Sequence, residues 1–354
     1  GFIEEVAVNV PRLDYSDGEC PILLLEPTRT NFITYSNGFT DSSWLTTGST
    51  VVSGVISPDG TNNAFTLSNT SSSGIIQKAV SATGIRVLSI FAKKGTHRYL
   101  RMGAYGGTSS YANFDLQNGV VANGANANIE NYGNGWFRCI CHSVSGTTGG
   151  VQIYPSNNTT GAATTNGSIQ IYGVHLQQAS TGEINPTSYI PTSGSAVTRV
   201  GDVCNNGGND QVINSTEGVL YIETSALSND LSERRFGLSD GTSSNVVRVG
   251  YTSLSNRIIA VIYNGSNQAV MTYTSPDITQ NSKIAVKYKA NDFALWVDGV
   301  ERSTDINGSV FTANTLNSLS FNIGGGSHFY SETKDVRVYN TALTDSELAT
   351  LTTI

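Results

Sequence analysis

The segment from Lys283 to Val300 reads KIAVKYKANDFALWVDGV, and it predicts the fold class on its own. Its first part, Lys283–Tyr288, alternates apolar with polar side chains, as a β-strand with one buried face does. A second apolar run, Phe293–Val297, precedes the dipeptide Asp298-Gly299, which adopts the positive φ angles of a tight turn at little cost. The segment therefore predicts two strands, of which the second opens a β-hairpin that continues into Val300.

Runs of the same kind recur along the whole chain. They are separated by Gly, Asn, Asp and Ser clusters, including the turn dipeptides Asn118-Gly119 and Asn264-Gly265. Many short strands at this spacing are typical of β-sandwiches of the jelly-roll or lectin kind. We therefore expect an all-β fold made of two tandem antiparallel β-sandwiches. The clearest further strands are Ile85–Ala92, Tyr99–Tyr105, Gly135–Cys141, Ile169–Leu176, Gly218–Glu223, Val246–Tyr251 and Arg257–Tyr263.

The composition excludes several other classes of protein. Of 354 residues only 13% are charged, and the 37 Gly argue against a helical bundle or a coiled coil. No apolar run approaches the roughly 18–20 residues of a membrane-spanning helix, so we expect no membrane insertion. The formal net charge of −7, without a Lys/Arg block, argues against a nucleic-acid partner. The chain opens without an initiator Met or a signal peptide, which is typical of a fragment.

Composition also indicates how the chain is organised. The apolar patch Ile22–Leu25 lies in an extended, Pro-punctuated arm and must be covered by its own domain or by a neighbouring subunit. Near the end, the capping box Thr344–Glu347 predicts a short helix with Leu348 and Leu351 on its apolar face. The predicted parts are an N-terminal assembly arm (1–30), a first sandwich (31–200), a Gly- and Asn-rich linker (201–215) and a second sandwich (216–354).

Several of these segments resemble known families. The stretch PRLDYSDGECPILLLEPTRTN, from Pro11 to Asn31, resembles one that recurs in head-spike, head-fibre and tail proteins of tailed bacteriophages. Residues 32–199 resemble the carbohydrate-binding-module jelly roll that accompanies it, and residues 216–354 are similar to the laminin-G/concanavalin-like sandwich. The matching pieces are Ser57–Ala64, Phe91–Gly95, Phe114–Gly119, Gly135–Cys139 and Thr187–Thr192 in the first sandwich, and Lys283–Tyr288, Phe293–Val300 and Lys334–Thr344 in the second.

The resemblance implies a protein on the exterior of a phage virion, on the head or the tail. It implies attachment to host cell-surface polysaccharide without catalysis, contacts with other virion proteins through the N-terminal arm, and a homo-oligomer, most often a trimer. Two alternatives stay open. The chain could be a purely structural capsid or tail decoration protein that binds no ligand, or a polysaccharide depolymerase.

One pair of strands carries the candidate glycan-binding residues. Along His97–Tyr105, period two places His97, Tyr99, Arg101 and Tyr105 on one face and Leu100, Met102 and Ala104 on the other. In the next strand Tyr111, Asn113, Asp115 and Gln117 alternate with Ala112, Phe114 and Leu116 in the same way. If the strands pair, aromatic, cationic and amide side chains form one surface, which could equally be a solvated face or a subunit contact. Trp44 is a further candidate.

The sequence shows no metal centre or catalytic constellation of a known kind. In Cys139-Ile140-Cys141-His142 the two cysteines share one face of a strand and the histidine points away, so the three cannot converge on zinc. No Glu-x-Asp-x-Glu triplet of a concanavalin-like glycosidase occurs, and Glu332 and Asp335 flank a strand but point apart. We expect no cofactor. A structural Ca²⁺ stays open because both resembled families often carry one, with ligands that cannot be named.

Overall fold

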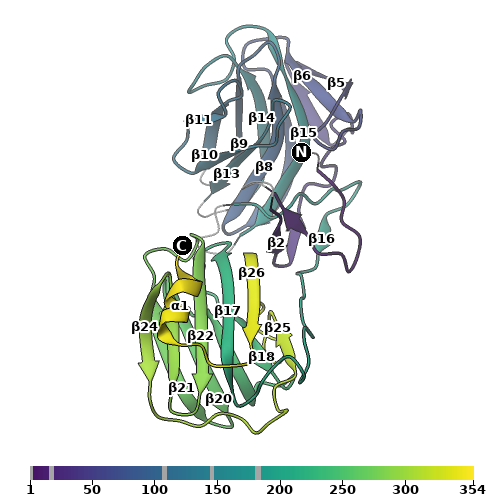
Figure 1. Cartoon of the computed structure of the whole chain (residues 1–354). Coiled ribbons are helices and arrows are strands. Elements are labelled where there is room, and N and C mark those ends of the chain that lie inside the picture. The colour runs from purple at the N-terminus through teal and green to yellow at the C-terminus, as the bar shows by residue number, and fades with distance from the viewer. Residues whose placement is uncertain (1–2, 16–19, 106–109, 144–146, 180–184) are drawn as a thin grey trace. The chain divides into compact units, whose positions relative to one another are not determined.

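The computed structural model describes residues 3–15, 20–105, 110–143, 147–179 and 185–354. These residues are almost entirely β-strand, with antiparallel pairing between all neighbouring strands, so the expected all-β fold is confirmed (Figure 1). The chain forms two compact units. The first consists of residues 1–5 and 28–200, and the second of residues 6–27 and 201–354.

The described part of the first unit contains two six-stranded sheets and one two-stranded sheet. The first sheet, in spatial order, holds β11 (Val120–Asn123), β10 (Ser110–Asp115), β9 (Tyr99–Tyr105), β14 (Thr147–Ser156), β7 (Ile75–Thr83) and β4 (Trp44–Thr47). The second holds β12 (Ala127–Asn131), β13 (Trp136–Ser143), β8 (Arg86–Lys94), β15 (Gly167–Gln178), β6 (Ala64–Asn69) and β5 (Ser49–Val55). The short pair is β3 (Arg29–Asn31) with β16 (Val197–Arg199).

The core of the first unit lies between its two large sheets. Alternate side chains from each sheet are buried there, as period two requires, and a fully buried Leu or Ile of this kind stabilises the fold by about 1.5–3 kcal/mol. Cys139 and Cys141 belong to this core, whereas His142 is partly exposed. Representative members are Leu67, Ile76, Leu88, Ile90, Leu100, Met102, Phe114, Val151, Ile153, Ile171 and Val174.

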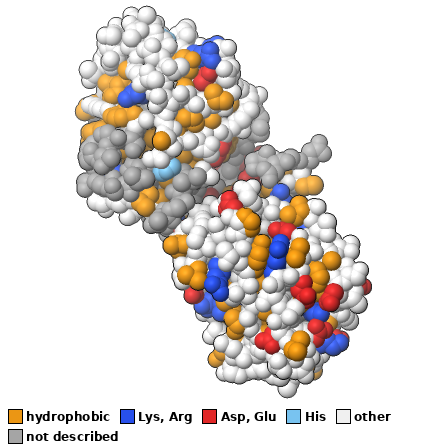
Figure 2. All heavy atoms as spheres, turned by 90° about the vertical axis from the view of Figure 1, so that its left-hand side faces the viewer, with side chains coloured by type: hydrophobic (Ala, Val, Ile, Leu, Met, Phe, Trp, Pro, Cys, Tyr) orange, Lys and Arg blue, Asp and Glu red, His pale blue; other side chains and the backbone are white. Residues whose placement is uncertain are grey.

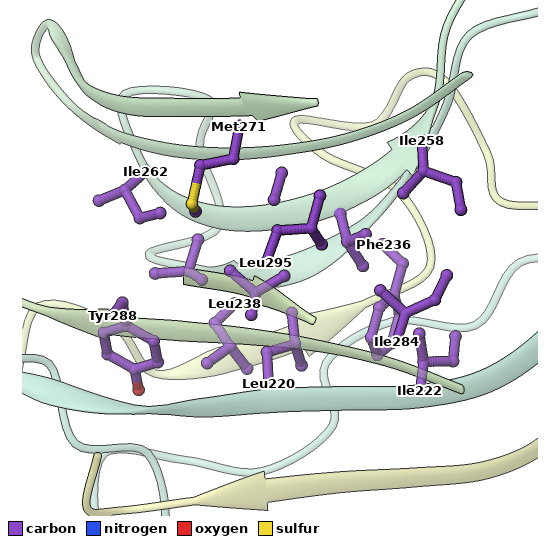
Figure 3. Close-up of a cluster of buried hydrophobic side chains, with 14 of the residues drawn as sticks. Leu220, Ile222, Phe236, Leu238, Ile258, Ile262, Met271, Ile284, Tyr288 and Leu295 are labelled. Atoms are coloured by element: carbon purple, nitrogen blue, oxygen red, sulfur yellow. The ribbon is translucent and has the colours of Figure 1, made fainter. Parts of the chain in front are cut away.

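The described part of the second unit contains a seven-stranded and a five-stranded sheet. The larger sheet holds β1 (Leu13–Asp14), β2 (Ile22–Leu25), β26 (Ser331–Tyr339), β17 (Glu217–Ala226), β22 (Ser282–Lys289), β23 (Phe293–Val297) and β24 (Val300–Asp305). The smaller holds β21 (Asn267–Thr274), β20 (Arg257–Asn264), β19 (Asn245–Tyr251), β18 (Arg234–Ser239) and β25 (Ser318–Ser320). Side chains from both sheets point toward one another in the core between them, among them Leu220, Ile222, Phe236, Leu238, Ile258, Ile262, Met271, Ile284, Tyr288 and Leu295 (Figure 3).

The hairpin and the helix expected from sequence are both present. β23 and β24 pair through Asp298 (φ 53°) and Gly299 (φ 76°), and two consecutive positive φ angles are what a two-residue hairpin turn needs. Helix α1 (Asp345–Thr352) begins at the capping box, in which the Thr344 hydroxyl accepts from the Glu347 N–H and Glu347 accepts from the Thr344 N–H at 2.8 Å. Leu348 is buried in a cluster with Trp296, so α1 packs on the outer face of the seven-stranded sheet.

The predicted arm and the predicted linker both pack against the second unit. Strand β2 of the arm joins β26, so its apolar side chains are covered by the second unit. Arg12 forms an ion pair with Glu26 at 2.7 Å and another with Asp202. In the predicted linker, Gly207 bridges to Leu319 at the sheet edge and Ile213 is buried in the core. Unpaired backbone groups at a sheet edge explain why a polar segment adds to it.

Charged side chains are sparse on the surface, in keeping with the low charged fraction of the sequence. Figure 2 shows basic and acidic side chains scattered among uncharged ones on the face that it draws. The single α-helix among the described residues is too short to cross a membrane, and no other candidate span is found in them.

Candidate ligand-binding site

The predicted row of polar and aromatic side chains lies on the outer face of the first sheet of the first unit. β9 and β10 pair antiparallel, with Arg101 opposite Asn113 and Tyr99 opposite Asp115. The alternating residues Leu100, Met102 and Phe114 are buried in the core, which leaves the others on the opposite face. The sharing of one face is therefore confirmed for the residues of the two rows that lie within β9 and β10.

Arg101 is the centre of this face. Its Nη1 donates to Asn113 Oδ1 at 3.0 Å and to the carbonyl of Thr160 at 3.1 Å. Its guanidinium also lies over the ring of Tyr111, 4.6 Å from the ring centroid. These contacts hold the planar group in place, and the N–H groups on Nε and Nη2 have no acceptor among the described residues.

A hydrogen-bonded row runs from Tyr111 across two further strands. The hydroxyls of Tyr111 and Tyr154 both donate to Gln152 Oε1, the latter at 2.9 Å, and Gln152 Nε2 donates to Gln77 Oε1 at 2.8 Å. Burial raises the pKa of Tyr111, and burial together with Tyr111 raises the pKa of Tyr154 to about 12. Both hydroxyls therefore stay protonated at neutral pH, and each keeps its oxygen lone pairs as acceptors.

The loop between β14 and β15 closes one end of the face. Asn113 Nδ2 donates to the carbonyls of Asn158 and Gly161, at 3.0 and 2.9 Å. Ser156 Oγ donates to the same two carbonyls, at 3.1 and 2.6 Å. Asn113 is 1% exposed, so it fixes this loop beside Arg101 and does not itself present a free amide.

Tyr105 provides an aromatic ring at another point of the face. It lies opposite Gly150 in the neighbouring strand β14. A Cβ at Gly150 would come within 2.6 Å of Tyr105 Cε1, and one at Gly149 within 3.3 Å of Cε2, so the ring rests on bare backbone. Tyr105 is partly exposed.

Three other residues of the predicted row, Tyr99, Asp115 and Gln117, are held in different roles. Asp115 is buried and accepts from Arg98 Nε at 2.8 Å and from the N–H groups of Gln117 and Asn118. Hydrogen bonds from Arg98 lower the pKa of Asp115. Arg98 also lies over Tyr99, 5.2 Å from its ring centroid. Because β10 ends at Asp115, Gln117 stands in the turn after the strand. Its Oε1 accepts a hydrogen bond from Lys94 Nζ at 3.0 Å.

His97 and Trp44 do not lie on this face. His97 is buried against Gly167, and its Nε2 lies 3.1 Å from Asn69 Oδ1 and 3.0 Å from the Thr165 carbonyl oxygen. Trp44 is 4% exposed and belongs to the core. Its Nε1 donates to the Tyr35 carbonyl at 2.9 Å, and Lys78 Nζ lies 5.4 Å from its ring centroid. Trp44 is therefore left out of the candidate site.

The structure adds Gln77, Gln152 and Tyr154, which sequence reasoning did not select. The run Val151-Gln152-Ile153-Tyr154 has the same alternation as the chosen strands and could have drawn attention. Its place beside β9 follows from pairing between segments about 50 residues apart. No local pattern reports such pairing.

The described residues contain no group of three or more His, Cys, Asp or Glu that could hold a metal ion. A cavity of about 330 Å³, lined by residues such as Arg29, Phe32 and Gln178, shares no residue with the candidate face. The chemistry of aromatic rings and convergent polar groups favours the face over that cavity.

Comparison with known protein families gives a match in the second unit. Residues 223–349 match the family model described as the concanavalin A-like lectin/glucanases superfamily, Laminin_G_3. The match runs from β17 into α1 and covers less than half of the chain. No curated protein matches the chain significantly.

Similar solved structures include domains of several sandwich proteins. The CBM40 of Ruminococcus gnavus IT-sialidase, bound to alpha2,3 sialyllactose, aligns with 43% of this chain and 95% of its own, at 15% identity and a TM-score of 0.35. Domains LG4-5 of the mouse laminin alpha1 chain align over 96% of both chains, at 8% identity and a TM-score of 0.29. Sheep galectin-11 covers 35% of this chain and 89% of its own, at 11% identity and a TM-score of 0.25. Likeness at this level carries no argument about a ligand.

Proposed function

We propose that this protein binds glycans without catalysis, through the outer face of the first sheet of the first unit. The observation that carries the proposal is the set Arg101, Tyr111, Gln152 and Tyr154, fixed by mutual contacts, beside the Tyr105 ring. Sites of this kind lose little side-chain entropy on binding because their members are already held in place.

The hydrogen-bonding groups and the aromatic ring of this set suit the hydroxyl and C–H groups of a sugar. Arg101 has N–H donors on Nε and Nη2 that no described residue accepts, and the hydroxyl oxygens of Tyr111 and Tyr154 can act as acceptors. Tyr105 offers a partly exposed ring that rests on Gly150, and the exposed part of the ring can stack on the C–H groups of a pyranose. A hydroxyl-rich ligand can therefore be recognised by stacking and by donors and acceptors together.

The only carboxylate of the predicted row is unsuited to hydrolysis. Asp115 is buried and bonded to Arg98 and to two backbone N–H groups, and its pKa is lowered. A glycosidase needs one carboxylic acid that is protonated and a second carboxyl group about 5–9.5 Å away. These facts favour binding over a depolymerase.

The biological setting rests on the resemblance of Pro11–Asn31 to phage head-spike, head-fibre and tail proteins. We propose that the chain stands on the exterior of a virion, meets host cell-surface polysaccharide, and forms a homo-oligomer, a trimer in the first instance. Several weak sites on one particle would act together through avidity. Light scattering on the purified chain gives the oligomer number, and antibody labelling of virions gives the location.

A glycan array that includes host capsule and cell-wall polysaccharides tests the binding proposal. The wild-type protein is expected to bind a subset, and Tyr105→Ala and Arg101→Ala to weaken that binding roughly tenfold or more, as loss of about 1.5–3 kcal/mol implies. Tyr15→Ala, at a tyrosine that is 56% exposed in the second unit, is the matched control and should bind normally.

Three experimental outcomes would contradict this proposal or favour one of its alternatives. A flat array for the wild-type oligomer, together with no binding to host cells, removes the glycan-binding proposal. Burial of Arg101 and Tyr105 between protomers would favour a purely structural decoration protein. Release of reducing ends from host polysaccharide would favour the depolymerase.

A further inference from the structure

A second exposed sheet face, in the second unit, carries three arginines. Arg235 in β18, Arg248 in β19 and Arg257 in β20 all alternate with core residues such as Phe236, Val247 and Ile258, which places them on the outer face of the five-stranded sheet. All three are partly exposed. This face belongs to a different unit from the candidate site described above.

Arg248 differs from the other two arginines because its guanidinium has no hydrogen-bond or ion-pair partner among the described residues. Arg235 Nη2 donates to Glu233 Oε2 at 2.6 Å, and Arg257 Nη2 donates to Thr272 Oγ1 at 3.1 Å. For Arg248 no hydrogen bond or ion pair is found within the part of the chain that the structure describes. A guanidinium carries five N–H donors and stays charged at any physiological pH.

The local charge on this face is opposite to that of the whole chain. Arg235, Arg248 and Arg257 stand with a single acidic partner, Glu233, although the formal net charge of the protein is −7. Burial and the neighbouring charge of Arg235 lower the pKa of Arg248, whereas the charge of Glu233 acts in the opposite direction. Glu233 balances only one of the two guanidinium charges, so the pair keeps a net positive charge that a further anion would offset.

The backbone beside Arg248 is bare on the side of β18. The cross-strand partner there is Gly237, whereas Val261 is the partner in β20, and Gly250 lies two residues further along β19. A Cβ at Gly237 would come 2.4 Å from the Val247 carbonyl oxygen, and one at Gly250 would come 1.8 Å from that of Arg234, so only glycine fits at either position. Gly237 therefore places no side chain beside Arg248 on the side of β18.

We infer that this face, with Arg248 and Arg235 at its centre, binds the anionic groups of an acidic polysaccharide. The planar fork of a guanidinium pairs with a carboxylate or a sulfate through two parallel hydrogen bonds. The partly exposed hydroxyl of Thr272 lies in the neighbouring strand β21, on the same face of the sheet, and suits a ligand that also carries hydroxyls.

Affinity electrophoresis of the full-length protein tests this inference. The probes are dextran sulfate, polygalacturonate and neutral dextran, cast in the gel at low ionic strength. The wild-type protein should be retarded by at least one of the two polyanions and not by neutral dextran, and the retardation should weaken with added salt. Retardation by one polyanion alone identifies whether sulfate or carboxylate is the preferred group.

Variants locate the site within the second unit. Arg248→Ala should weaken polyanion binding about tenfold or more, and Arg248→Lys, which keeps the charge without the fork, should have an intermediate effect. Arg337→Ala removes an exposed arginine that is paired with Asp335 elsewhere in the same unit, and should bind like the wild-type protein. Circular dichroism and the thermal midpoint confirm that each variant is folded.

The outcomes separate this inference from the proposed function. Tyr105→Ala in the first unit should leave polyanion binding unchanged, whatever it does on the glycan array. The inference is overturned if neither polyanion retards the wild-type protein, or if a folded Arg248→Ala is retarded as strongly as the wild type.

Discussion

The ring of Tyr105 rests on the backbone of Gly150, where a Cβ would come 2.6 Å from Tyr105 Cε1. The absence of a side chain on β14 therefore decides how an aromatic ring on β9 lies. The two residues belong to strands that pair over long sequence distance, so the position of the ring is a property of the sheet and not of either strand alone.

Substitution of Gly150 should lower the stability of the first unit. In Gly150→Ala the new Cβ would meet Tyr105 and also the Lys78 carbonyl oxygen at 2.3 Å, so we expect a loss of about 1–3 kcal/mol in the free energy of unfolding. Urea unfolding measures this loss. Gly161→Ala is the matched control, since a Cβ there meets nothing within 4 Å, and its effect should stay within about 0.5 kcal/mol. Equal effects of the two substitutions would contradict the packing argument.

Asn113 should prove a structural residue of the candidate face. Asn113→Ala leaves the carbonyls of Asn158 and Gly161 without its amide, and we expect a loss of about 1–3 kcal/mol in unfolding free energy. The same loop carries the Thr160 carbonyl, which accepts a hydrogen bond from Arg101 and helps to orient its guanidinium. Displacement of the loop should therefore lower the affinity for the ligand as well. Asn118→Ala, at an exposed position in the turn after β10, serves as the control in the same urea titration. If Asn113→Ala leaves the free energy of unfolding unchanged, the loop is held by other contacts.

His175 should make the stability of the first unit depend on pH. It is fully buried, neither ring nitrogen has a hydrogen-bond partner among the described residues, and burial lowers its pKa well below the ordinary value, with Arg138 and Arg199 acting in the same direction. The folded state therefore keeps the ring neutral while the unfolded chain takes up a proton below about pH 6.5. The stability should be fully present above that pH and fall as pH decreases, by up to about 1.4 kcal/mol per pH unit.

Urea midpoints at pH 5, 6, 7 and 8 measure this dependence. His175→Phe should flatten the decline between pH 6.5 and 5, whereas His142→Gln, at a partly exposed histidine of the same unit, should flatten it less. An unchanged slope in a folded His175→Phe would assign the pH dependence to other groups.

The capping box should matter for the second unit. Thr344→Ala removes the hydroxyl that accepts from the Glu347 N–H, and caps of this kind contribute about 0.5–2 kcal/mol. Because α1 covers Trp296 through Leu348, fraying of its first turn should also change the near-UV circular dichroism of that tryptophan. Ser346→Ala, inside the first turn, keeps both bonds of the box and should have little effect. A Thr344→Ala variant as stable as wild type would mean that packing alone holds the helix.

The sequence by itself determined the parts of the fold that depend on neighbours along the chain. Period two separates Leu100 and Met102 from Tyr99 and Arg101, because successive side chains of a strand point to opposite faces. Asp298-Gly299 predicts a hairpin and Thr344–Glu347 a helix start, because both depend on local backbone angles and local hydrogen bonds.

Only the tertiary structure decided which strands lie side by side and which side chains stay accessible. It brought Gln152 and Tyr154 of β14 next to Arg101, turned Trp44 into the core, and used Asp115 to hold Arg98 and a turn. It also drew the polar segment 201–215 onto the edge of a sheet and left Arg248 without a partner among the described residues. The physical reason is that pairing between distant strands depends on burial and backbone hydrogen bonding over the whole sheet, which no short stretch of residues encodes.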